Sequence, residues 1–160
     1  MERYGIEKIT GGVEDFLIDK VNGILPEYED EDVKLPLLGN KNILHGAVDV
    51  SRCKSDVVVS ITVDEQTEVD DGAITEHTFD TSLNIVFICS HASYDVLVSR
   101  ASRYASALKR AMLESPTFGG RFVGSGFGSL EIDYDAGAVG GQMTAAAFRL
   151  TVRTDELTEE

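Results

Sequence analysis

The chain has 160 residues, of which 42% are hydrophobic and 26% charged, and its formal net charge is −14. This length and composition predict one globular domain with a sizeable core rather than a disordered chain. So strong a negative charge argues against a protein that reads nucleic-acid sequence, and no apolar run approaches the roughly 20 residues of a membrane span. The N-terminus also lacks the layout of a cleaved signal sequence.

A helix over residues 6–25 is the first predicted element. Pro26 is expected to end it. Five carboxylates between residues 27 and 32 then indicate a solvated loop, which continues through residue 42. The predicted helix has apolar residues at intervals of three and four, on one stripe: Ile6, Ile9, Val13, Phe16, Leu17, Val21 and Ile24.

The middle of the chain predicts strands. A short strand is expected over residues 45–50, and residues 57–63 are rich in β-branched side chains. A further strand is expected over residues 78–89. Asp70-Asp71-Gly72 stands between these last two runs and is a hairpin signal.

The strand over residues 78–89 carries apolar residues on both of its faces in its second half. Leu83, Ile85 and Phe87 alternate on one face, and Val86 and Ile88 on the other. A strand of this kind is expected to be covered on both sides.

The outer part of the hairpin, residues 64–80, is polar on both faces. A two-stranded ribbon without an apolar face is marginal in water. We therefore expect an arm that projects from the domain and is ordered by a neighbouring subunit or a partner. Its carboxylates are Asp64, Glu65, Glu68, Asp70, Asp71, Glu76 and Asp80. The basic residues expected to face them are Arg100, Arg103, Lys109, Arg110 and Arg121.

A second helix is predicted over residues 93–113, with Ser93 as its N-cap and Asp95 in its first turn. Pro116 follows its end. Small residues in this helix favour close packing on a sheet. The apolar stripe consists of Leu97, Ala101, Tyr104, Ala105, Leu108 and Met112.

Two strands complete the chain, over residues 130–134 and 143–152, and an acidic, frayed tail is expected over residues 155–160. Hairpin-connected strands with two helices are typical of an α+β fold. We predict a single α+β domain over residues 1–160, with a mostly antiparallel sheet, a long projecting β-hairpin and two flanking α-helices.

No pattern in the sequence indicates catalysis. The run Gly124-Ser125-Gly126-Phe127-Gly128 lacks the spacing of a dinucleotide fingerprint, and we interpret it as a flexible start to the following strand. Asp133-x-Asp135-x-Gly137 is half of a calcium loop without the remaining ligands.

The cysteines and histidines do not form a metal set either. Cys89-x-His91 is one close pair without a second, which is too little for a structural zinc site, and no third group is placed to orient it as a nucleophile. Cys53 and Cys89 are expected to be reduced and buried, since small oxidised domains generally carry more cysteines. We predict no catalytic residue, cofactor or metal.

Residues 83–152 resemble the tail terminator, or tail completion, proteins of long-tailed bacteriophages. The resemblance lies in the strand Leu83-Asn84-Ile85-Val86-Phe87-Ile88, in the helix over 94–113 with Arg103-Tyr104-Ala105, in the breaker Pro116-Thr117-Phe118-Gly119-Gly120, and in the last strand Ala145–Val152. The N-terminal helix and the long hairpin also fit this family.

This resemblance implies a non-enzymatic ring, usually of six subunits, at the neck of the virion. Such a ring caps the tail tube protein, joins it to the head connector or adaptor protein, and lets the genomic DNA pass through its channel. Its location would be the virion neck or tail, and the host cytoplasm during assembly, with no membrane. A head-completion or adaptor ring is an alternative. A small cytoplasmic enzyme or a ligand-binding α+β domain is an alternative of another class.

Overall fold

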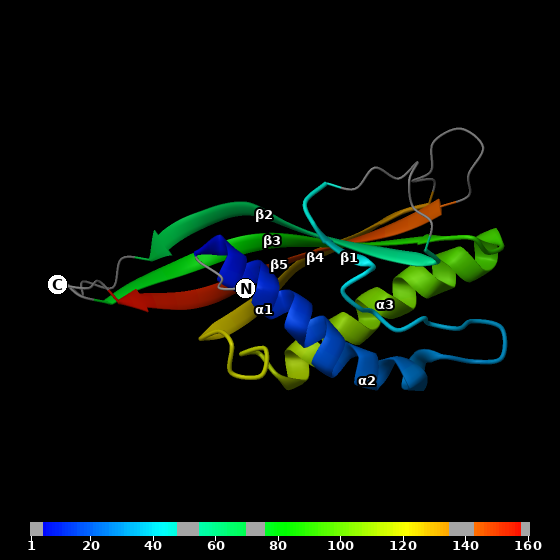
Figure 1. Cartoon of the computed structure of the whole chain (residues 1–160), viewed down its shortest axis with the longest axis horizontal. Helices are drawn as coiled ribbons and strands as arrows, with labels where there is room; N and C mark the ends of the chain where they lie inside the picture. Colours follow the sequence, from blue (N-terminus) through cyan, green and yellow to red (C-terminus); the bar gives the residue numbers. More distant parts are fainter. Residues whose placement is uncertain (1–4, 48–54, 70–75, 135–142, 158–160) are drawn as a thin grey trace.

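The computed structural model describes residues 5–47, 55–69, 76–134 and 143–157 (Figure 1). Within them the chain forms a five-stranded sheet of order β1-β2-β3-β5-β4, and the helices lie on one face of it (Figure 1). The predicted α+β fold with a mostly antiparallel sheet is therefore confirmed. The elements are α1 (Ile6–Phe16), the π-helical turn η1 (Leu17–Val21), α2 (Asn22–Ile24), the 3₁₀ turn η2 (Leu25–Tyr28), β1 (Ile43–His45), β2 (Val57–Val69), β3 (Glu76–Ser90), α3 (Tyr94–Glu114), β4 (Gly124–Asp133) and β5 (Met143–Leu157).

The N-terminal helical segment runs without a break from α1 to η2. Pro26 does not end it, as the sequence analysis expected, but lies in the first turn of η2. Proline is accepted there because the amide of a first helical turn has no partner within the helix. Gly12 is buried against Phe122, and a Cβ at this glycine would lie 3.1 Å from the Phe122 ring. The glycine therefore lets α1 approach the segment that precedes β4.

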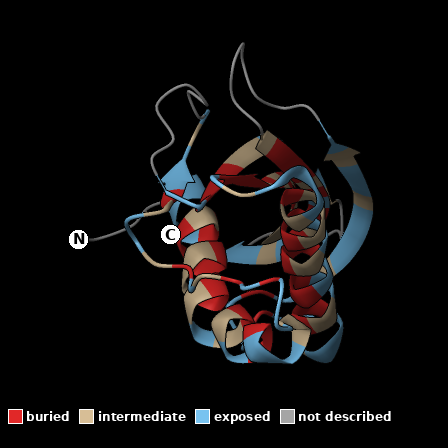
Figure 2. Cartoon of the chain, turned by 90° about the vertical axis from the view of Figure 1, so that its right-hand side faces the viewer, coloured by how far each residue is buried: buried red, intermediate tan, exposed pale blue. Residues whose placement is uncertain are grey.

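The second helix, α3, matches its prediction closely. Its predicted apolar stripe is buried at every position, and the buried faces of the helices turn toward one another and toward the sheet (Figure 2). Tyr104 stacks on Phe87 of β3, with ring centroids 5.6 Å apart. Ser93 occupies the N-cap position as predicted, although its side chain makes no cap hydrogen bond.

The strands differ from their predicted bounds at three places. β1 lies over Ile43–His45 rather than 45–50, and it pairs in parallel with β2; residues 48–50 lie outside the described residues. β4 begins at Gly124, so the glycine run is part of the strand and not a flexible start to it. A register shift between Phe127 and Ser129 marks a bulge in β4.

The two faces of β3 are covered to different degrees. Leu83, Ile85 and Phe87 are fully buried under the helices. On the other face Ile88 is buried and Val86 is half-buried. The prediction that both faces of this strand are covered is therefore confirmed at Ile88 and only partly at Val86.

β5 is the third strand whose bounds differ from the prediction. β5 continues to Leu157 and pairs with β3 along its whole length, from Ser90↔Met143 to Glu76↔Leu157. Residues 155–157 therefore belong to the sheet, whereas a frayed tail was expected; residues 158–160 lie outside the described residues.

Candidate subunit interface

The outer ends of β2, β3 and β5 form an extension that we call the arm, comprising residues 65–69, 76–82 and 151–157. β4 borders its inner part as a fourth strand, where Gly124–Gly126 pairs with residues 151–153. The far end of the arm reaches beyond the start of α1 (Figure 1). The expectation of a two-stranded ribbon is wrong, because β5 supplies a third strand. The register sets Val69 opposite Thr78 and Thr78 opposite Asp155.

Side chains join all three strands of the arm. Gln66 Nε2 donates to Thr81 Oγ1 at 2.9 Å, and Thr78 Oγ1 donates to Asp155 Oδ1 at 2.7 Å. His77 Nδ1 lies 2.6 Å from Glu68 Oε1. These bonds, with the backbone ladders, order the arm within one subunit.

The predicted carboxylates of the arm fall into three groups. Asp64 and Glu65 are exposed and form no ion pair with a described residue. Glu68 is paired with His77, and Asp80 with Arg153. Asp70 and Asp71 lie outside the described residues, and so does the side chain of Glu76.

The basic residues predicted to face the arm are mostly engaged elsewhere. Arg103 donates to the Tyr28 carbonyl and to Asp30 Oδ2, both at 2.8 Å. Arg110 lies 3.0 Å from both Glu27 Oε2 and Glu114 Oε1.

These pairs fasten the acidic loop that follows η2 to α3. The Arg103 guanidinium holds the pKa of Asp30 below its ordinary value, chiefly through their hydrogen bond, and Arg110 does the same for the pKa of Glu114. Both carboxylates therefore stay ionised near neutral pH.

Two further predicted cations also have partners within the subunit. Arg100 is only 8% exposed and its Nε donates to the Lys34 carbonyl at 3.0 Å. Arg121 Nη2 lies 2.8 Å from Asp19 Oδ2. Their contact with the arm of a neighbouring subunit stays a prediction.

Lys109 and Arg149 are the cations near β4 that form no ion pair with a described residue. Lys109 lies over the Phe127 ring, with its Nζ 4.7 Å from the centroid, a cation–π contact that leaves the ammonium in water. Arg149 is exposed on β5. Arg149 is not among the predicted interface residues, although the alternation along residues 143–152 places it on the face opposite the buried Phe148 and Leu150.

The outer edge of β4 is both open and apolar. Among the described strands β4 pairs only with β5, so its other edge presents unpaired backbone groups. Phe127 is 40% exposed and Leu130 37%, and Val123, just before the strand, is 53% exposed. Exposed edges of this kind are templates for pairing with another chain.

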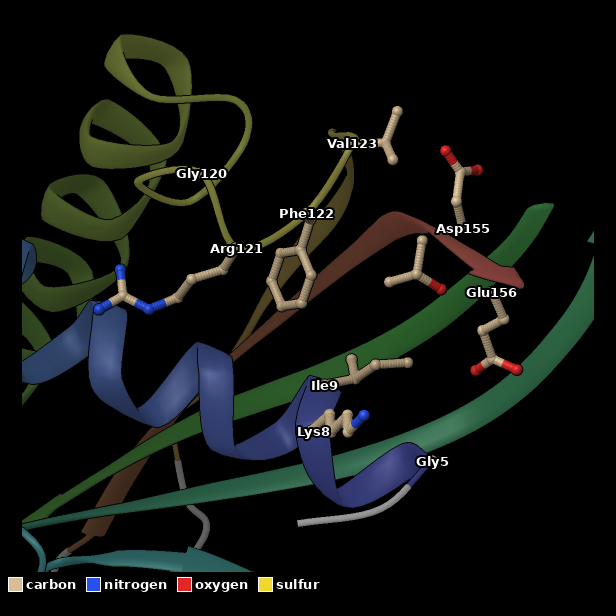
Figure 3. Close-up of a pocket in the computed structure, with 10 residues that line it drawn as sticks. Gly5, Lys8, Ile9, Gly120, Arg121, Phe122, Val123, Asp155 and Glu156 are labelled. Atoms are coloured by element: carbon tan, nitrogen blue, oxygen red, sulfur yellow. The ribbon is translucent and has the colours of Figure 1, made fainter. Parts of the chain in front are cut away.

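A groove of about 710 Å³ lies beside the arm, between the start of α1, the segment before β4 and the end of β5 (Figure 3). Phe122 and Ile9 form its apolar floor, Lys8 and Arg121 lie on one side, and Asp155 and Glu156 project from β5. The charges in its lining are of both signs, and Thr154 adds a hydroxyl group.

Metal ligands do not gather at any one place among the residues that the structure describes. These residues contain no group of three His, Cys, Asp or Glu side chains able to hold a metal ion. Burial raises the pKa of the Cys89 thiol to about 12, which makes it inert, and His91 is exposed. Cys53 lies outside the described residues. Of the described helices, none is long and apolar enough to cross a membrane.

No protein-family model matches the sequence, and no curated protein does either. Solved structures do resemble the fold. One is a chain from the virion of a native gene transfer agent particle, with 14% identity and a TM-score of 0.47 over 72% of this chain and 79% of that one. Another is the sheath/tube terminator of an extracellular contractile injection system in its extended state, with 11% identity and a TM-score of 0.48.

The terminator match covers 99% of this chain but 59% of that one, so this chain spans little more than half of its length. Its description corresponds to the family that the sequence resembles.

Proposed function

We propose that the chain is the structural subunit of a tail terminator ring in a phage-like particle. The proposal is supported by the resemblance of residues 83–152 to that family. It is supported in the structure by one observation: within the described residues the sheet has an open strand edge on each of its two sides, at β4 and at the part of β2 that extends beyond the short β1. Two different open surfaces on one subunit suit head-to-tail contacts, which close into a ring when the rotation between neighbours allows it.

In the family, the ring usually has six subunits, caps the tail tube and joins it to the head connector. We extend these properties to this chain as part of the proposal. A net charge of −14 suits a channel through which DNA slides, because like charges keep the phosphates from adhering to the wall. The role is non-enzymatic, and its place is the virion neck or tail.

The proposal is tested by the mass of the purified protein in solution and by electron microscopy of negatively stained samples. We expect a species near six times the subunit mass of 17.4 kDa, seen as annuli with a central hole. A mass of one subunit at all concentrations, with no annuli, would contradict the proposal. An open filament of variable length would contradict the ring.

A further inference from the structure

Besides the short outer side of β1, two longer edges of the sheet have no strand partner in the described chain. β1 pairs with β2 only from Val59 to Ile61, so the edge of β2 from Thr62 to Val69 is open. The second open edge is the outer side of β4. Both present backbone N–H and C=O groups that another strand can bind.

The two open edges lie at the same level of the sheet. Ser129 of β4 is opposite Arg149, which is opposite Asn84, which is in turn opposite Thr62 of β2. By the same reckoning Phe127 is level with Val63. A neighbouring copy placed beside β4 without any shift along the strands therefore brings the open part of its β2 against the first half of β4.

The strand directions also agree with such pairing. β2 and β3, β3 and β5, and β5 and β4 are all antiparallel pairs, so β4 runs opposite to β2. When the next copy keeps the same orientation, its β2 is antiparallel to β4 of the first. The sheet then continues from one subunit to the next in the pattern that it has inside each subunit.

Charge favours this arrangement over pairing of like edges. The β2 edge carries Asp64 and Glu65, which have no ion pair in the described chain. Beside β4 lies Arg149, equally without one, and its neighbour across the strand pair is the small Ser129. A side chain as long as that of arginine can reach over so small a residue to a carboxylate on the next strand.

Bulges interrupt both edges at almost the same level. One lies between Val63 and Glu65 of β2, and the other between Phe127 and Ser129 of β4. A bulge bends an edge and discourages pairing with a regular strand. Two edges that bend at matching levels fit one another better than either fits a straight strand, which limits the choice of partner.

We infer that β4 of one subunit pairs antiparallel with the Thr62–Val69 edge of β2 in the next copy, so that one sheet continues around the ring. In this interface Arg149 is level with Thr62 of the neighbour and reaches diagonally toward its Glu65, and Phe127 meets Val63 under Lys109. The inference rests on the proposed function, because only a head-to-tail assembly joins two unlike edges. It goes further by naming the strands, their register and the charge pair.

Disulfide trapping tests the pairing. We would introduce Thr62→Cys and Ser129→Cys together in a Cys53→Ser background, leaving the buried Cys89 in place. Mild oxidation is expected to give a ladder of covalent oligomers on a denaturing gel, ending at the ring. The two single-cysteine variants alone should give no disulfide dimer, and their mixture should give dimers but no ladder.

Each outcome of the trapping experiment decides a different claim. Annuli without a ladder would overturn the strand pairing and leave the proposed ring intact. Dimers of Ser129→Cys alone would show that like edges meet, which also overturns the inference. Neither annuli nor covalent oligomers would overturn both proposals.

Charge reversal provides a second test. Glu65→Lys or Arg149→Glu alone should weaken subunit association about fivefold, as expected for the loss of one exposed pair, and the double variant should recover most of that loss. Glu31→Lys, in the exposed loop after η2, is the matched control and should leave association unchanged. Equal weakening by all three single variants, or no recovery in the double variant, would contradict the Glu65–Arg149 pair.

Discussion

Arg153 of β5 donates two parallel hydrogen bonds to Asp80 of β3, from Nε to Oδ1 at 2.8 Å and from Nη2 to Oδ2 at 3.0 Å. The two residues are directly opposite in the sheet. Such paired bonds between guanidinium and carboxylate are the most directional of ionic contacts. They fasten the last part of β5 to the arm.

The first prediction concerns the acid sensitivity of this contact. The hydrogen bonds from Arg153 hold the pKa of Asp80 below its ordinary value of 3.8. A carboxylate whose pKa is lowered on folding stabilises the protein above its unfolded pKa, and this stabilisation disappears as the pH falls through the folded pKa. Asp80→Asn should therefore lower the unfolding temperature at pH 7 and make less difference at pH 3.

Asp64→Asn serves as the control for that experiment, since Asp64 lies in the same hairpin but has no ion pair with a described residue. It should change the unfolding temperature little at either pH. A difference between wild type and Asp80→Asn that stays constant from pH 7 to pH 3 would contradict the assignment.

The second prediction concerns the packing of α3 on the sheet. Leu108 is fully buried, whereas Leu113 on the same helix is 66% exposed. Leu108→Ala should cost about 2–5 kcal/mol of unfolding free energy. Leu108→Asp should abolish folded protein, because an unpaired buried carboxylate costs several kcal/mol of the roughly 5–15 kcal/mol that stabilise a domain.

Leu113→Asp is the matched variant and should fold normally. Denaturant unfolding followed by circular dichroism measures all three proteins. If Leu108→Asp unfolds at the wild-type midpoint, the buried face of α3 has been assigned wrongly.

The third prediction concerns the hydroxyl of Tyr104, which donates a hydrogen bond to the Pro36 carbonyl. Burial raises the pKa of this tyrosine, so the hydroxyl stays protonated. Tyr104→Phe keeps the stacking on Phe87 but leaves the carbonyl of Pro36 without this partner, at a cost of about 1–3 kcal/mol. Faster proteolysis of the segment between residues 27 and 42, with α3 intact, is expected by limited digestion and mass spectrometry. An unchanged cleavage pattern would contradict this role.

Local patterns in the sequence were sufficient to predict the elements that have a regular apolar period. Leu97, Ala101 and Leu108 mark the buried side of α3, and Leu83 and Ile85 that of β3, because burial on one face leaves its period in the sequence. Contacts between distant segments leave no such period. The parallel pairing of β1 with β2 and the docking of the 27–42 loop on α3 could therefore not be predicted.

The arm was predicted in part for the same reason. The hairpin between β2 and β3 has an Asp-Gly turn signal, but its third strand is Asp155–Leu157, whose acidic sequence resembles a solvated tail. Likewise, the pairs that Arg103 and Arg110 form with Asp30 and Glu27 within the subunit were not predicted. A cation pairs with the nearest carboxylate in space, which charge counting along the chain does not identify.

The fourth prediction is that the purified protein holds no metal at one equivalent. Cys89 and His91 do not form a joint metal site, because the Cys89 thiol is buried with a raised pKa while the His91 imidazole is exposed. Of the half calcium loop Asp133-x-Asp135-x-Gly137, only Asp133 lies within the described residues. Elemental analysis, with unfolding measured before and after a chelator, checks this. Zinc or calcium at one equivalent would contradict it.

The last prediction removes the arm. The register shows how to do so, because Val63 is opposite Leu83 and Leu83 is opposite Leu150. Replacing residues 64–82 by a two-residue turn, and ending the chain after Val152, cuts all three strands near the same level. The helices and the inner sheet remain, so the shortened subunit should keep its cooperative unfolding transition and its helical circular dichroism. It should no longer form annuli, because the open edge of β2 and the acidic side chains of the arm are gone.

A second variant that ends after Thr154 but keeps the hairpin serves as the control. It separates the loss of the β2 edge from the loss of the end of β5 alone, and it should still assemble. Annuli formed by the doubly shortened chain at wild-type yield would exclude the arm from assembly.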